Sequence, residues 1–96
     1  MTAEQLVKDK REEILRVARR HGAYNVRLFG SVARGEANEG SDVDLLVDLE
    51  PGRSVLDQAE LVLDLQNLLD RRVDVVTEAG LYWLLRRRIL KEARAL

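Results

Sequence analysis

The sequence contains no cysteine, which excludes both a disulfide framework and a metal site built from thiolates. It has no apolar run near the roughly 18 residues that a membrane-spanning helix needs, and its first residues lack the apolar core of a signal peptide. Neither sign of charge is in excess, because 16 lysines and arginines stand against 17 aspartates and glutamates. A basic surface typical of nucleic-acid-binding proteins is therefore not expected. These absences favour a cytoplasmic protein that contacts neither membrane nor nucleic acid.

What is present is a globular composition, with 46% apolar and 34% charged residues in a chain of 96. A chain of this length buries roughly two thirds of the surface that its unfolded form exposes. That is enough for one small core, so we expect a single domain over residues 1–96 and no second domain that could enclose a large substrate.

Hydrophobic periodicity and turn residues divide the chain into alternating helices and strands in the order αβ(α)βαβα. The expected helices run from Thr2 to about His21, from a cap at Ser54 to about Leu69 and from Glu78 to Leu96. The expected strands run from Tyr24 to Phe29, from Ser41 or Asp42 to about Leu49 and from Arg71 to Thr77. A brief helical turn capped by Ser31 runs through Arg34, and a polar loop covers 35–41. The inward residues of the second helix are expected to be Val55, Ala59, Val62 and Leu69.

The connections between strands predict how they pair. The second and third strands are joined by a helix, so they should be parallel neighbours with a right-handed crossover. If the first strand lies antiparallel to the second, its end at Gly30 reaches the edge of the sheet where the other two begin. The apolar strand faces can then all point toward one layer of helices. We therefore predict an α+β fold, a two-layer sandwich with a short, mixed, three-stranded sheet and helices on one face.

The strongest local motif is Asp42-Val43-Asp44 at the start of the second strand. Residues two apart on a strand project to the same side, ~6.6 Å apart along the chain. Two carboxylates placed in this way repel each other unless a cation lies between them. Oxygen ligands suit Mg²⁺, which keeps several waters and takes phosphate oxygens as further ligands. An isolated Asp-x-Asp is more often a solvated strand face, so the motif needs support from its surroundings.

The surroundings supply that support. Gly30-Ser31 follows the first strand, where a glycine lets the backbone approach a phosphate and the turn can donate N–H groups and a hydroxyl to it. Arg34 follows one turn later and could reach a polyphosphate. Asp74 is placed by the topology beside Asp42 and Asp44, as a third metal ligand and a candidate base for an attacking hydroxyl. Ser41, directly before Asp42, is a further candidate for binding substrate.

The same residues carry a family resemblance. The stretch LFGSVARGEANEGSDVDLLVDL, from Leu28 to Leu49, resembles the signature of the DNA polymerase β-like nucleotidyltransferase superfamily: Gly-Ser, ten residues, then Asp-x-Asp. The later segment RRVDVVT resembles the strand that carries the family's third carboxylate, which places that role on Asp74. The resemblance covers almost the whole chain as a minimal nucleotidyltransferase domain.

The resemblance implies an activity and a partner. Asp42, Asp44 and Asp74 would be catalytic and would bind Mg²⁺, as two ions, with Mn²⁺ as a substitute. Gly30, Ser31, Arg34 and Ser41 would bind a nucleoside triphosphate, expected to be ATP. Small proteins of this type resemble antitoxins paired with HEPN-domain ribonuclease toxins, and some transfer AMP from ATP to a tyrosine of the toxin. Others are thought to act by binding alone, so a non-catalytic module that masks a HEPN ribonuclease is the alternative.

The last predicted helix suggests where a partner binds. Leu81, Leu85 and Ile89 form one apolar stripe, whereas Tyr82, Trp83 and Leu90 lie largely outside it. A small two-layer domain can cover one stripe of a helix but not its whole circumference. We therefore expect a second apolar surface covered by a HEPN-type protein or, failing that, by a second copy in a homodimer. The alternative is a helix sunk more deeply between its neighbours.

Overall fold

The structure, a computed structural model, describes residues 1–38 and 40–96. Its helices are α1 (Ala3–Asp9), α2 (Arg11–Arg20), α3 (Gly30–Ala33), α4 (Val55–Leu69), the 3₁₀ helix η1 (Glu78–Gly80) and α5 (Trp83–Glu92). Its strands are β1 (Ala23–Phe29), β2 (Val43–Leu49), β3 (Val73–Val76) and β4 (Arg94–Ala95). The predicted loop 35–41 includes position 39, which lies outside the described residues. None of the helices in the described ranges is long and apolar enough to cross a membrane.

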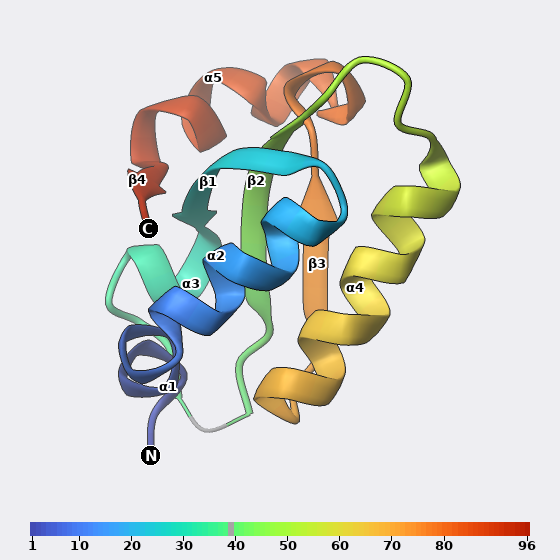
Figure 1. Cartoon of the computed structure of the whole chain (residues 1–96). Helices are drawn as coiled ribbons and strands as arrows, with labels where there is room; N and C mark the ends of the chain where they lie inside the picture. The colour runs from blue at the N-terminus through green and yellow to red at the C-terminus, as the bar shows by residue number, and fades with distance from the viewer. Residues whose placement is uncertain (39) are drawn as a thin grey trace.

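The strands form one mixed sheet in the order β3-β2-β1-β4. As predicted, β2 and β3 are parallel, with α4 between them in sequence, and β1 is antiparallel to β2. Figure 1 shows α2 and α4 side by side over one face of this sheet. The predicted α+β sandwich is therefore confirmed.

The predicted count of three strands is wrong by one, because the last helix does not reach the chain end. It ends at Glu92, Ala93 adopts an extended conformation, and Arg94–Ala95 pairs with the free edge of β1. The Leu96 backbone N–H then donates to the Val26 carbonyl at 3.0 Å, and the Leu96 side chain packs against the core. Edge pairing and burial of a terminal leucine together favour this strand over a final helical turn.

The predicted first helix is also divided. Thr2 and Gln5 form a capping box at the expected start, in which the Thr2 amide donates to Gln5 Oε1 and the Gln5 amide to Thr2 Oγ1. Lys10 then leaves helical geometry, with φ −99° and ψ 10°, and separates α1 from α2. This break changes the direction of the chain between two helices that both bury an apolar side chain, Val7 in α1 and Ile14 in α2.

The core lies between the sheet and α2 and α4. Its fully buried side chains come from α2, β2 and α4: Ile14, Val43, Leu45, Val47, Leu61 and Leu65. Within α4 the inward stripe is Leu61, Leu65 and Leu69, whereas Val55 is 82% exposed, so the predicted stripe was wrong in its first turns. A helix of 15 residues is about 22 Å long and the four residues of β3 span only about 13 Å, so the start of α4 extends past the strand that it covers.

The other face of the sheet is only partly open. Leu46, between Asp44 and Asp48 on that face, is fully buried, and Arg27 there makes an ion pair with Glu78 of η1 at 3.7 Å. The C-terminal elements therefore cover part of the face opposite the helical layer. At the end where β2 and β3 begin, Asp42 and Asp74 remain exposed and Asp44 is partly buried.

Candidate active site

The first feature of the candidate site is the close approach of Gly30 to Asp44. Phe29 at the end of β1 is paired with Asp44 in β2, so the turn after β1 begins beside the carboxylate. Gly30 has φ +75°, and a Cβ on this residue would lie 2.3 Å from Asp44 Oδ2. The left-handed backbone conformation favours glycine at this position, and any side chain here would also displace the Asp44 carboxylate.

The second feature is a group of carboxylates. Asp44 and Asp74 are register partners on the parallel strands β2 and β3, whose spacing is about 4.8 Å. Asp42 immediately precedes β2. Burial raises the pKa of Asp44 to about 6, and the negative charges of Asp74 and then Asp42 add to the rise. The topology thus places the three carboxylates at the same end of the sheet, as the sequence predicted. Both Asp74 and Asp42 are close enough to raise the pKa of Asp44.

The arrangement fits a divalent cation by its chemistry. The donors are all carboxylate oxygens. After burial, the repulsion from Asp74 and Asp42 is the next cause of the raised pKa of Asp44, and a bound cation would relieve that repulsion. In the described ranges, no three acidic, histidine or cysteine side chains are already gathered closely enough to enclose a metal ion. The carboxylates would therefore have to rotate toward a shared ion.

The turn after β1 differs from its prediction in one detail. α3 begins at Gly30 with Phe29 as its N-cap, so Ser31 lies inside the turn and is not its cap. The predicted capping role of Ser31 is wrong because the glycine itself starts the helix. The partly buried Ser31 side chain still lies in the same turn as the Gly30 N–H.

Arg34 ends this turn and is held by two acids. Its Nε donates to Glu36 Oε2 at 3.0 Å and its Nη1 to Glu92 Oε2 at 2.9 Å. The same oxygen of Glu92 accepts a bond from the Gly30 N–H at 3.2 Å. Sequence analysis missed Glu92, which lies 62 residues after Gly30 and belongs to no recognisable motif.

Ser41 lies at the end of the loop that leads to Asp42. Its hydroxyl accepts a bond from the Asn38 N–H at 2.9 Å, and its own N–H donates to the Asn38 carbonyl at 3.2 Å. These contacts close the turn immediately before the first aspartate, so Ser41 helps to place Asp42.

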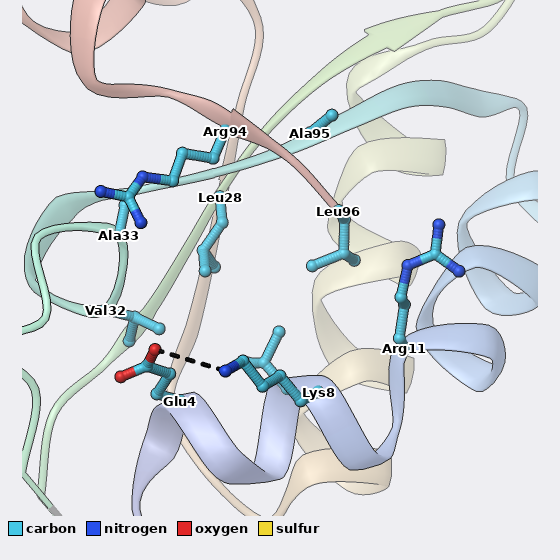
Figure 2. Close-up of a pocket in the computed structure, with 10 residues that line it drawn as sticks. Glu4, Lys8, Arg11, Leu28, Val32, Ala33, Arg94, Ala95 and Leu96 are labelled. Carbon is cyan, nitrogen blue, oxygen red and sulfur yellow. Dashed lines mark ion pairs between the residues drawn. The ribbon is translucent and has the colours of Figure 1, made fainter.

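Two further features include none of the predicted site residues. His21, at the end of α2, is paired with Asp64 of α4 at 2.6 Å, a contact that links the two helices. A pocket of about 260 Å³ lies between α1, α3 and β4, lined by residues that include Leu28, Val32 and Leu96 (Figure 2). None of the predicted site residues lines this pocket.

Comparison with known proteins gives the family. Residues 10–96 match the family described as nucleotidyltransferase domain. A Thermococcus cleftensis protein named protein adenylyltransferase MntA is 44% identical over 73 residues, which cover 76% of this chain and 74% of that protein. This chain belongs to the nucleotidyltransferase domain family, and the expected class of enzyme is confirmed.

Solved structures agree with the fold. One described as a "putative minimal nucleotidyltransferase" is 53% identical, with a TM-score of 0.85, and the match covers 97% of this chain and 95% of the other. A toxin-antitoxin structure with AMP-PNP is 23% identical, with a TM-score of 0.75, over 88% of this chain and 69% of the other. At that identity the second likeness concerns the fold alone.

Proposed function

We propose that this protein transfers AMP from ATP to a hydroxyl of a partner protein in a Mg²⁺-dependent reaction. The observation that carries the proposal is the convergence of Asp42, Asp44 and Asp74 beside the Gly30-Ser31 turn, with the pKa of Asp44 raised to about 6. Support for the nucleotide comes from the relative named as a protein adenylyltransferase and from the neighbour of similar fold solved with AMP-PNP.

The three aspartates would hold Mg²⁺, as two ions, and Mn²⁺ is expected to replace it. When bound, the metal would neutralise the triphosphate and stabilise the charge that develops on the leaving pyrophosphate. The turn at Gly30 and Ser31, with Arg34, would bind the β and γ phosphates and so fix the α phosphate in line with the acceptor. Asp74, the exposed member of the Asp44–Asp74 pair, would help to remove the acceptor's proton.

We propose further that the acceptor is a HEPN-type ribonuclease and that this protein is its antitoxin. The support is an apolar surface on the last helix: Tyr82, Trp83, Leu84 and Leu85 are 58%, 73%, 58% and 46% exposed. The expectation that Leu85 packs inward is wrong, because η1 and the extended residues after it turn the start of α5 away from the core. The patch therefore gains Leu84 and Leu85, whereas Leu90, which the sequence placed in it, is only partly exposed. Large exposed aromatic and leucine side chains are typical of a surface that a partner covers.

The test uses the protein and the product of the neighbouring gene, mixed with Mg²⁺ and ATP labelled on the α phosphate. Transfer of label to the partner by the wild type, and no transfer by Asp44→Asn, would support the proposal. A stable complex without label would instead favour the alternative, a module that masks the ribonuclease by binding. The cytoplasmic location stays a prediction from the sequence.

A further inference from the structure

Glu92 makes contacts that place a carboxylate where a phosphate is proposed to bind. It is the last residue of α5, and its Oε2 accepts bonds from the Gly30 N–H at 3.2 Å and from Arg34 Nη1 at 2.9 Å. Its side chain is only 16% exposed, so the contact is shielded from solvent. Two of the donors assigned to the β and γ phosphates are thus already bonded to an anion of the protein itself.

The surroundings of Glu92 are cationic. Arg34, Arg87, Arg88 and Lys91 line a shallow groove along α5, together with Leu84 and Glu92. Among these lining residues, all of them within the described ranges, Glu92 is the single acid, and its Oε1 lies 3.7 Å from Arg88 Nε. A groove with this positive charge attracts a polyphosphate, and the carboxylate of Glu92 neutralises part of that positive charge.

Glu92 also adds negative charge near the aspartates: burial, Asp74 and Asp42 raise the pKa of Asp44 most, Arg34 lowers it, and Glu92 adds the smallest rise. A backbone N–H carries one proton and makes one strong hydrogen bond, so the Gly30 amide cannot serve Glu92 and a phosphate fully at the same time. Glu92 therefore opposes triphosphate binding in two ways: it repels the phosphates, and it occupies the Gly30 N–H that they would use.

We propose that Glu92 is a built-in competitor of the triphosphate, which holds the phosphate donors of the free protein and must leave them before the nucleotide binds. This inference rests on the proposed nucleotide-binding function and concerns the regulation of the same site. Glu92 lies on the helix that carries the exposed apolar residues 82–85, so the strength of its contact depends on where α5 lies.

The experiment compares the affinity of the wild type, Glu92→Gln and Glu92→Ala for Mg²⁺-AMP-PNP and for inorganic tripolyphosphate, by calorimetry. Removing a shielded charge that bonds two donors is expected to tighten the binding of both probes roughly five- to tenfold. Glu36→Gln is the matched control, because Glu36 also bonds Arg34 but its side chain is 64% exposed. Its effect should stay within about twofold, as expected for a solvent-screened pair.

Tighter binding by the Glu92 variants, with the control near the wild type, would support the inference. Affinity equal to or below that of the wild type in both Glu92 variants would overturn it, since Glu92 would then be neutral or would assist nucleotide binding. If the wild type nevertheless binds Mg²⁺-AMP-PNP, the proposed function is retained although the inference fails. Failure of all four proteins to bind either probe would overturn the proposed function, and the inference with it. Thermal melting of each variant confirms that the folded protein was measured.

Discussion

The Asp44 carboxylate lies against the Cα of Gly30, so that a Cβ on residue 30 would be 2.3 Å from Asp44 Oδ2. Gly30 begins the turn proposed to hold phosphate, and Asp44 lies in the strand proposed to hold metal. The pairing of Phe29 with Asp44 brings these two halves of the candidate site together, and the close contact leaves no room for a side chain between them. A residue with any side chain at position 30 must either push the carboxylate aside or move the turn.

Gly30→Ala should for this reason lose nucleotide affinity as well as stability. Alanine at φ +75° costs of the order of 1 kcal/mol, and the contact with Asp44 adds to that cost. Gly52→Ala is the control, because Gly52 has φ +89° but a Cβ there would meet nothing within 4 Å, and it follows the end of β2 opposite to Asp42 and Asp44. Urea unfolding and calorimetry with Mg²⁺-AMP-PNP measure both effects. Equal affinities in the two variants would show that the Gly30–Asp44 contact has no role in binding.

Asp44→Asn should leave the protein at least as stable as the wild type at pH 7 and abolish transfer. The pKa of Asp44 is raised in the folded state, so its contribution to stability is greatest below the unfolded pKa of 3.8 and is lost as pH rises to about 6. Asparagine carries no charge, so the variant avoids this loss of stability at pH 7. Solvent screening limits the difference to about 1 kcal/mol. Asp48→Asn on the same strand is the control, since it removes an ion pair with Arg27 and should not stabilise. An Asp44→Asn protein that melts well below the wild type would make this residue structural.

Ser31→Ala should weaken triphosphate binding with little effect on folding. Because Phe29 is the N-cap of α3, the alanine variant does not lose the roughly 1 kcal/mol that a capping serine contributes. Thermal melting and nucleotide titration on the same samples separate the two properties. A clear loss of stability at unchanged affinity would assign Ser31 a structural role.

Nucleotide binding should require Mg²⁺ or Mn²⁺. Without a cation, the carboxylates of Asp42, Asp44 and Asp74 repel the phosphates as they repel one another. Calorimetry with ATP, in the presence of either metal and in EDTA, tests this requirement. Equal affinity in EDTA would mean that the aspartates do not bind the nucleotide through a metal.

Trp83→Glu should prevent assembly with the partner while nucleotide binding stays unchanged, because Trp83 is 73% exposed and its ring lies beside that of Tyr82, with centroids 6.1 Å apart. Leu63→Glu on α4, at a residue 60% exposed, is the matched control for an exposed apolar side chain elsewhere. Size-exclusion chromatography with light scattering on co-expressed proteins gives the outcome. A complex that survives Trp83→Glu would place the interface away from α5.

The sequence predicted the part of the candidate site whose geometry follows from how the strands are connected. The helix between β2 and β3 requires parallel pairing, and parallel pairing in register puts Asp74 beside Asp44. Glu92 could not be found in this way, because its contact with Gly30 joins distant parts of the chain through the packing of α5. The two-residue strand β4 is too short to produce an alternating pattern, and the break at Lys10 interrupts a periodicity that continues on both sides. Local patterns thus predicted that the three aspartates of the candidate site lie together, and tertiary packing decided what contacts the turn proposed to bind phosphate.

The most direct test of the account is label transfer from ATP, carrying a radioactive α phosphate, to the co-purified partner protein in the presence of Mg²⁺. The account predicts label on the partner with the wild type, none with Asp44→Asn or Asp74→Asn, and none in EDTA. A wild-type protein that binds both Mg²⁺-ATP and the partner and yet transfers no label would contradict it.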